Sequence, residues 1–154
     1  MQLNLGWQWY TWSELDAPTL YDLLRLRVDV FVVEQKCAYP ELDGLDAQCD
    51  HLLVRDHAGM LIGYLRLLPP GLKSPLPTLG RLIVAEAARG QGIARALAQE
   101  GVRGCQLRYP EHDIHISAQQ HLEAFYQSLG FAVVSTPYLD DGIWHVDMRK
   151  VWQR

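Results

Sequence analysis

The sequence predicts an α/β protein in which helices cover both faces of a mixed sheet, built as a single domain over residues 1–154. The chain has 154 residues and is 49% hydrophobic, which suffices for one domain with a sizeable core and is too short for two ordinary ones. Segments with apolar residues at three- and four-residue steps interleave with segments that alternate or run apolar, as strands do. The expected order is strand, helix, hairpin, strand, helix, strand, helix, strand, strand.

The N-terminal part of the chain predicts a strand followed by a helix. Trp7 and Trp9 stand at alternate positions, which is typical of a strand, and residues 13–18 predict a polar turn. From Thr19 to Gln35 the apolar residues share one helical face, and β-branched valines weaken the far end of this helix.

A loop and a hairpin are expected next. Residues 39–50 contain too many carboxylates and too much Pro and Gly for a regular element, so they predict an acidic loop. Two apolar segments, 52–54 and 60–68, flank a polar turn that ends at Gly59, as in a hairpin. Prolines between 69 and 77 then prevent regular structure.

The middle of the chain predicts a strand, a glycine-bearing turn and a helix. Residues 79–84 are strand-like, and residues 94–106 place small apolar side chains on one helical face. The turn between them carries Arg89, Gly90 and Gly92 at a helix N-terminus, where free N–H groups and the helix dipole attract phosphate. Glycine lets the backbone approach an anion closely, and arginine adds a permanent charge.

A tight loop without any ligand is the alternative explanation of this Gly-x-Gly. Two common nucleotide-binding patterns fit poorly. The dinucleotide fingerprint has a third glycine where this chain has Arg95, and the Walker pattern needs Gly-Lys-Ser/Thr, which is absent. A phosphate-bearing ligand of another kind is therefore expected.

The C-terminal part predicts a strand, a helix and two final strands. Residues 114–117 alternate in polarity, and a helix is expected from about Gln119 to Leu129, with Gly130 where helices commonly end in a left-handed residue. The last strands are expected around 131–133 and from 143 to 151.

Composition excludes several classes of protein. A net charge of −4 and a pI near 5.8 give no broad basic surface for DNA or RNA. The longest apolar runs fall far short of the roughly 20 residues of a membrane helix, and no secretory signal is evident, so we expect a cytoplasmic protein without a membrane partner. The 3 cysteines are odd in number and widely spaced, which favours reduced thiols over disulfides or a zinc knuckle.

Two motifs, in the right order, resemble one known family. Arg89-Gly90-Gln91-Gly92-Ile93-Ala94 looks like the Arg/Gln-x-x-Gly-x-Gly/Ala signature of the GNAT superfamily of acyl-CoA-dependent N-acyltransferases, and the segment from Phe125 to Phe131 is similar to its second hallmark. Residues 31–35 with 141–143 resemble the ElaA-like branch. The resemblance implies the GNAT fold, with a central mixed, mostly antiparallel sheet of six to seven strands and helices on both faces.

The resemblance also implies acetyl-CoA as co-substrate. In the family the glycine turn cradles the pyrophosphate of coenzyme A, while backbone groups of the central strand hold the pantetheine arm and polarise the thioester carbonyl. A glutamine here takes the place of an asparagine that contacts the cofactor. The implied cofactor-binding residues are Leu82, Ile83, Val84, Arg89, Gly90, Gln91, Gly92, Ile93, Ala94 and Gln119.

Catalytic roles are implied by position within the same motifs. Tyr126 stands where many members have the tyrosine that protonates the departing thiolate, which a phenol with a pKa of about 10 can do; an ordinary core tyrosine is the alternative. Glu34 is the first candidate for the general base, against a solvated helix-end carboxylate. His145 is the second, because histidine titrates near neutral pH, against a structural role. A water molecule could replace either.

The resemblance implies that Phe31 contacts the acceptor substrate. Glu41 and Asp43 of the acidic loop are further candidates for binding the acceptor. These carboxylates could attract a cationic amine, or simply be solvated. The 6 histidines form no convincing metal set, and the spacing of His112 and His115 does not converge two side chains on a strand, so no metal is expected.

The expected function is direct transfer of an acetyl group from acetyl-CoA to a primary amine of a small molecule or peptide. A non-catalytic acyl-CoA-binding or sensing module is the alternative, and a nucleotide-binding protein is a third. Edge strands and exposed tryptophans favour a homodimer.

Overall fold

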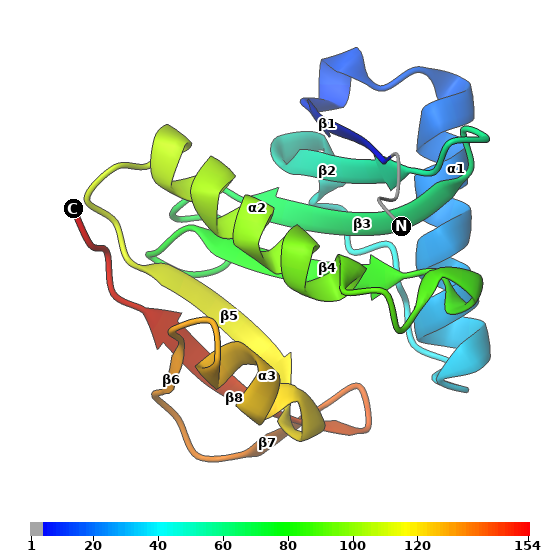
Figure 1. Cartoon of the computed structure of the whole chain (residues 1–154). Helices are drawn as coiled ribbons and strands as arrows, with labels where there is room; N and C mark the ends of the chain where they lie inside the picture. Colours follow the sequence, from blue (N-terminus) through cyan, green and yellow to red (C-terminus); the bar gives the residue numbers. More distant parts are fainter. Residues whose placement is uncertain (1–4) are drawn as a thin grey trace.

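The computed structural model describes residues 5–154, which form one mixed sheet with helices on both faces (Figure 1). The strand order is β1-β2-β3-β4-β5-β8-β6, with β7 also paired to β8; among the strands of residues 5–154, only β4 and β5 run parallel to each other. The strands are β1 (Gly6–Tyr10), β2 (Asp50–Arg55), β3 (Leu61–Leu68), β4 (Thr78–Val84), β5 (Ile114–Gln119), β6 (Ala132–Val133), β7 (Tyr138–Asp140) and β8 (Ile143–Lys150).

In the described part of the chain the sheet has 8 strands, slightly more than the six to seven expected. The additional strand is β7, in a polar segment that the sequence predicted only as a connection. It pairs Tyr138 with His145 and Asp140 with Ile143 across a tight turn. This segment has no apolar alternation of its own, and it forms a strand only because β8 lies beside it. The local sequence therefore does not predict a strand here.

Three α-helices and one π-helix of the described residues pack on the sheet. They are α1 (Ala17–Val28), the π-helix η2 (Asp29–Glu34), α2 (Ile93–Arg108) and α3 (Glu123–Gln127), and the short 3₁₀ turns are η1 (Trp12–Glu14), η3 (Asp46–Gln48), η4 (Glu86–Ala88) and η5 (Gln120–Leu122). None of the helices in the described part of the chain is long and apolar enough to cross a membrane.

Two of the expected helices differ in extent from the prediction. The first begins at Ala17 because the Asp16 carboxylate accepts a hydrogen bond from the Thr19 N–H at 2.8 Å, and it widens into η2 along the valine-rich end. The last is shorter than expected, because Gln119 still belongs to β5 and a 3₁₀ turn precedes α3. Gly130 is left-handed, as predicted, with φ of 96°.

Two buried clusters fill the two sides of the sheet. On β2, Leu52 packs into the cluster beneath α2 and α3, whereas the next residue, Leu53, packs against α1 together with Leu23. This alternation is the strand period of two, and it explains why β2 and β3 are apolar on both faces. Figure 1 shows α2 crossing one face of the sheet and α1 lying against the other side.

The sheet splits between β4 and β5. These strands pair only at Thr78 with His115 and at Leu79 with Ile116, and beyond that point they diverge. The register between β3 and β4 shifts near Arg81, a non-glycine residue with a left-handed φ of 55°. Such a bulge bends a strand, so the C-terminal half of β4 leaves β5.

Candidate active site

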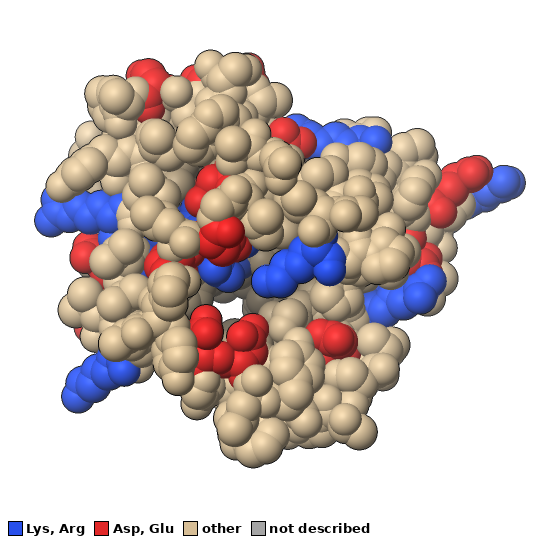
Figure 2. Space-filling model, turned by 180° about the vertical axis from the view of Figure 1, so that it is seen from behind, with Lys and Arg blue, Asp and Glu red and all other residues tan. Residues whose placement is uncertain are grey.

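A cleft of about 510 Å³ opens where β4 and β5 diverge. Its walls come from η2, β4, the start of α2, β5, η5, α3 and β8. Seen from behind, the molecule is hollowed near its centre, and both acidic and basic groups border the hollow (Figure 2). The cleft brings together most of the residues that the sequence singled out: Phe31, Glu34, Leu82, Ile83, Val84, Arg89, Ala94, Gln119, Tyr126 and His145.

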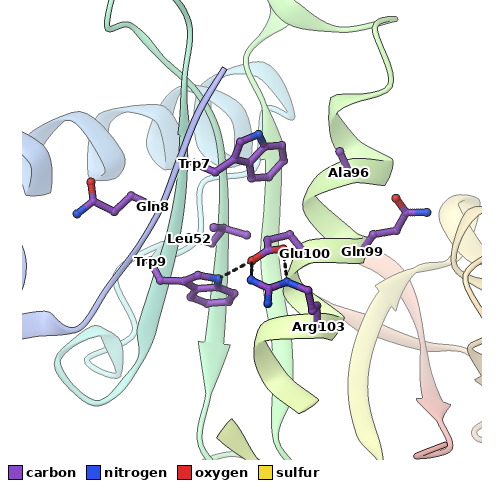
Figure 3. Close-up of a pocket in the computed structure, with 8 residues that line it drawn as sticks. All are labelled: Trp7, Gln8, Trp9, Leu52, Ala96, Gln99, Glu100 and Arg103. Carbon is purple, nitrogen blue, oxygen red and sulfur yellow. Dashed lines mark hydrogen bonds and ion pairs between the residues drawn. The ribbon is translucent and has the colours of Figure 1, made fainter. Parts of the chain in front are cut away.

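Another hollow, of about 590 Å³, lies between β1 and α2 (Figure 3) and holds none of the predicted site residues. Its charged groups and the Trp9 indole are engaged with one another. The Trp9 indole N–H donates to Glu100 Oε1 at 3.1 Å, and Arg103 binds the same carboxylate through Nε and Nη2. The cleft is therefore the better candidate for chemistry.

The glycine turn has the geometry of an anion cradle. Gly90 and Gly92 have φ of 80° and 79°, and a Cβ added to either would meet nothing within 4 Å. The first backbone bond of α2 runs from the Ala96 N–H to the Gly92 carbonyl. Within the described residues, the N–H groups of 90–95 donate to no protein acceptor, so they are available to phosphate oxygens at the positive end of the helix dipole.

Arg89, a predicted cofactor-binding residue, and Glu34, a candidate general base, form an ion pair with each other. Arg89 Nη1 and Nη2 each donate to a carboxylate oxygen of Glu34 at 2.9 Å, and Arg89 Nε donates to the Val84 carbonyl at 3.0 Å. The pair connects η2 to the end of β4 at the mouth of the cleft. Both carboxylate oxygens of Glu34 are thus engaged by Arg89, so neither is directed at an acceptor in the cleft without breaking this ion pair.

The central strand presents backbone amides to the cleft. Beyond its end, the Ala85 N–H donates to the Ile62 carbonyl on the β3 side at 2.8 Å. Because successive amides of a strand point to opposite edges, the N–H of Val84 and of Leu82 face the edge that β5 has left, whereas that of Ile83 faces β3. We therefore expect the N–H groups of Val84, and of Leu82 next to the bulge, to be donors available to a ligand in the cleft.

Tyr126 is partly buried, with its ring against those of two phenylalanines. The ring centroids of Phe125 and Phe131 lie 5.1 and 6.0 Å from that of Tyr126, both edge to face. Burial raises the pKa of Tyr126 to about 12, so the phenol keeps its proton at neutral pH. Its hydroxyl makes no hydrogen bond to any group in residues 5–154 and is free for a ligand in the cleft.

His145 lies across from Gln119 on the neighbouring strands β8 and β5. Its Nδ1 is 2.7 Å from the Ile143 carbonyl, and a carbonyl only accepts, so Nδ1 carries the proton and Nε2 keeps its lone pair when the ring is neutral. Gln119 Nε2 donates weakly to Gln35 Oε1 at 3.4 Å. Both side chains line the cleft.

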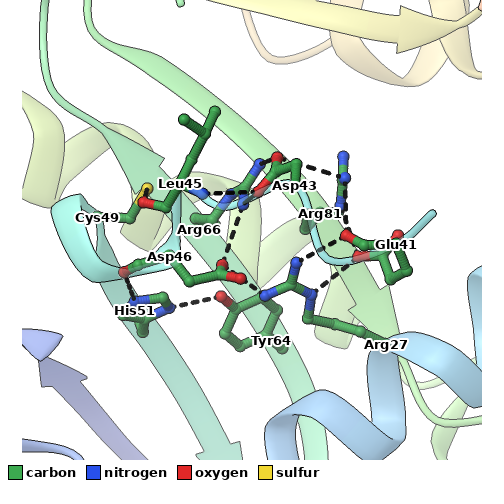
Figure 4. Close-up of polar contacts among 10 residues, drawn as sticks. All are labelled: Arg27, Glu41, Asp43, Leu45, Asp46, Cys49, His51, Tyr64, Arg66 and Arg81. Carbon is green, nitrogen blue, oxygen red and sulfur yellow. Dashed lines mark hydrogen bonds and ion pairs between the residues drawn. The ribbon is translucent and has the colours of Figure 1, made fainter. Parts of the chain in front are cut away.

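The acidic loop is bound to three arginines (Figure 4). Glu41 Oε2 accepts from Arg27 Nε at 2.9 Å and from Arg81 Nε at 2.7 Å. Burial alone would raise the pKa of the Asp43 carboxyl, but the hydrogen bonds and charge of Arg66 hold it well below its usual range. Neither Glu41 nor Asp43 lines the cleft, whereas Arg81 does and stands 5.8 Å above the ring of Phe31.

The arginines of this network were not foreseen. Their signal was present in β3, where Arg66 interrupts an otherwise apolar run and is 1% exposed. A buried arginine requires a carboxylate partner, and the nearby acidic loop offered several. Among residues 5–154, no three His, Cys, Asp or Glu side chains are close enough together to hold a metal ion.

Comparisons with known proteins agree with this geometry. The profile of the Acetyltransferase (GNAT) domain matches residues 25–152. The chain therefore belongs to the GNAT acetyltransferase family, whose general activity is acetyl-CoA-dependent N-acetyl transfer. The predicted family and fold class are confirmed.

Within that family the chain is ElaA-like. Protein ElaA of Escherichia coli (strain K12) is 39% identical over 148 residues, which cover 95% of this chain and 96% of that protein. The crystal structure of Escherichia coli ElaA matches with a TM-score of 0.88 at 37% identity, over 95% of this chain and 99% of that one. An acyl-CoA N-acyltransferase from Pseudomonas aeruginosa matches with a TM-score of 0.91 at 39% identity, over 96% and 100%.

Proposed function

We propose that this protein moves an acetyl group from acetyl-CoA directly to a primary amine. The observation that carries the proposal is that Arg89 and Ala94, which flank the anion cradle, line a cleft that also holds strand amides and a phenol without a partner in residues 5–154. A phosphate cradle alone would suit many ligands. Beside a partly buried proton donor and two backbone amides, the cradle suits a ligand that carries both a pyrophosphate and a thioester.

Each residue of the site has a proposed task. The turn from Arg89 to Ala94 holds the pyrophosphate, and the amides of Leu82 and Val84 hold the pantetheine arm and the thioester oxygen. An amide aimed at a developing oxyanion is worth roughly 3 to 4 kcal/mol in other enzymes. Gln119 adds a polar contact to the cofactor. Acetyl-CoA supplies the activated acetyl group.

Tyr126 is the proposed acid. It is protonated over the whole neutral range, it lines the cleft, and its hydroxyl is unpaired within the described residues, so it can give its proton to the departing thiolate. Of the two candidate bases, His145 is better placed than Glu34, because its Nε2 is free whereas both oxygens of Glu34 are bound by Arg89.

Phe31 is the proposed contact for the acceptor, since it lines the cleft beside Arg81. Glu41 and Asp43 support acceptor binding indirectly in this proposal, by holding Arg81 in place. Direct attraction of a cationic amine by these two carboxylates is less favoured, because their charge is compensated by arginines.

Calorimetric titration with acetyl-CoA, ATP and NAD tests the cofactor. Gly92→Glu places bulk and negative charge in the cradle and should abolish acetyl-CoA binding. Gly59→Glu is the matched control, because Gly59 has φ of 81° and equally open surroundings but lies in the β2–β3 turn. Binding of ATP or NAD in place of acetyl-CoA would support the nucleotide-binding alternative.

Turnover separates an enzyme from a sensing module. With a panel of primary amines, Tyr126→Phe should lower the rate of CoA release by about 10²-fold or more while leaving the affinity for acetyl-CoA unchanged. Tight binding of acetyl-CoA without any CoA release by the wild-type protein would favour the non-catalytic module.

A further inference from the structure

A chain of hydrogen bonds leads from the cleft to solvent through three residues that have no role in the acetyl transfer proposed above. Ser117, on β5, lines the cleft, and its Oγ is 2.5 Å from the hydroxyl of Tyr138 on β7. The Tyr138 hydroxyl donates to Asp147 Oδ1 on β8, also at 2.5 Å. The side chain of Asp147 is 35% exposed. The chain thus crosses from the interior of the cleft to water.

The direction of these bonds is fixed by proton counting. An ionised Asp147 can only accept, so the single proton of the Tyr138 hydroxyl is committed to it. The bond between Ser117 and Tyr138 must then be donated by Ser117. With its own proton used, Ser117 Oγ offers only lone pairs toward the cleft, which makes it an acceptor for an N–H group there.

The register of the sheet holds the chain in place. Ser117 and Asp147 are direct partners across β5 and β8, and Tyr138 is the register partner of His145 across β7 and β8. The rings of Tyr138 and His145 are also stacked, with centroids 6.1 Å apart and an interplanar angle of 22°. Burial and the adjacent Asp147 raise the pKa of Tyr138 to about 12, so it remains a neutral link.

We propose that Ser117, Tyr138 and Asp147 form a proton relay that deprotonates the ammonium group of the acceptor. Ser117 is the catalytic member that meets the amine, and Tyr138 and Asp147 are positioning residues that act through it. This inference rests on the proposed acetyl transfer and assigns it a route for the proton that amide formation must release.

The step balances. An N–H bond of the ammonium breaks and its proton passes to Ser117 Oγ, the Ser117 proton passes to the Tyr138 oxygen, and the Tyr138 proton passes to Asp147. The nitrogen keeps the electron pair that attacks the thioester carbonyl, and the carboxylate becomes a neutral acid. Asp147 then releases the proton to water, with His115 Nε2 3.5 Å away as the other titratable group facing it.

Substitutions can distinguish proton removal through the relay from proton removal by His145 alone. If His145 alone removes the proton, loss of the Tyr138 hydroxyl leaves turnover intact, because the ring that stacks on His145 is still present in phenylalanine. If the relay operates, removal of any one of its three polar groups interrupts it.

The experiment uses Ser117→Ala, Tyr138→Phe and Asp147→Asn, with Tyr109→Phe as control, a partly buried tyrosine at the end of α2. Acetyl-CoA binding is first measured by calorimetry, and CoA release is then followed between about pH 6 and pH 10 with primary amines that include α-amino groups, which lose their proton at about pH 8. The relay variants should bind acetyl-CoA like the wild type.

Turnover of the relay variants should fall by about 10²-fold at neutral pH. The loss should shrink as pH rises, because the amine then arrives already deprotonated, and the control should match the wild type. Wild-type rates in the variants, or a loss that is equal at every pH, would overturn the relay; Ser117→Ala decides the matter if Tyr138→Phe misfolds. Absence of CoA release by the wild type itself would instead overturn the transferase proposal, and the relay with it.

Discussion

Asp46 is the position at which the buried charge network should be most sensitive to substitution. Its Oδ1 accepts from Arg27 Nη1 at 2.6 Å and from Arg66 Nη1 at 3.0 Å, and these arginine side chains are 0% and 2% exposed. Asp46→Asn keeps the size of the side chain and removes its charge, so two buried guanidinium groups lose part of their compensation.

The expected cost follows from removing one member of a buried ion pair, which is about 3 to 5 kcal/mol. Glu41 still binds Arg27 and Asp43 still binds Arg66, so the lower end applies, about 3 kcal/mol. For a chain of this size that corresponds to a fall in melting temperature of roughly 6 to 12 °C.

Urea unfolding at neutral pH measures this free energy, with the dependence on urea unchanged if only stability is affected. Asp22→Asn is the control, because Asp22 is 3.5 Å from Arg55 and the two side chains are 48% and 28% exposed. An exposed pair of this kind contributes below about 1 kcal/mol. Equal losses in Asp46→Asn and Asp22→Asn would refute the importance of the buried network.

Further predictions concern acid, thiols and packing. The pKa values of Asp43 and Asp46 are lowered in the folded protein, so their contribution to the free energy of unfolding is complete above the ordinary value of about 3.9 and is lost as pH falls below it; acid titration by circular dichroism should show unfolding there. Burial raises the pKa of the Cys49 and Cys105 thiols to about 11 and about 12, so a thiol reagent at pH 8 should label Cys37 alone until urea is added. Gly104→Ala places a Cβ 2.4 Å from the Trp9 ring, so the melting temperature should fall although alanine favours a helix by about 1 kcal/mol; a rise would contradict the tight packing.

The parts of the fold that depend on local patterns could be predicted from the sequence. The β2–β3 hairpin, the strand, turn and helix around Gly90 and Gly92, and the left-handed Gly130 all follow from period, turn chemistry and glycine position. Both cradle glycines have positive φ, which suits a tight loop as well as an anion-binding turn, so anion binding there stays a prediction.

The parts of the fold and of the site that depend on contacts between distant residues could not be predicted from the sequence. The bulge at Arg81 is defined only by its register with β3, and Ser117 meets Asp147 only because β5 and β8 are neighbours in the sheet. The pairing of Glu34 with Arg89 joins residues 55 positions apart. Long-range contacts of this kind leave no local pattern, although a charged residue in a buried strand, such as Arg66, signals that a partner exists.

The short parallel contact between β4 and β5 has a mechanical consequence. It consists of two residue pairs, whereas β5 and β8 share six, so the sheet behaves as two smaller sheets joined along a short seam. Bending concentrates where the fewest interstrand contacts resist it. The slowest amide exchange should therefore occur within the two halves, and the width of the opening between them is governed by how they tilt about the seam.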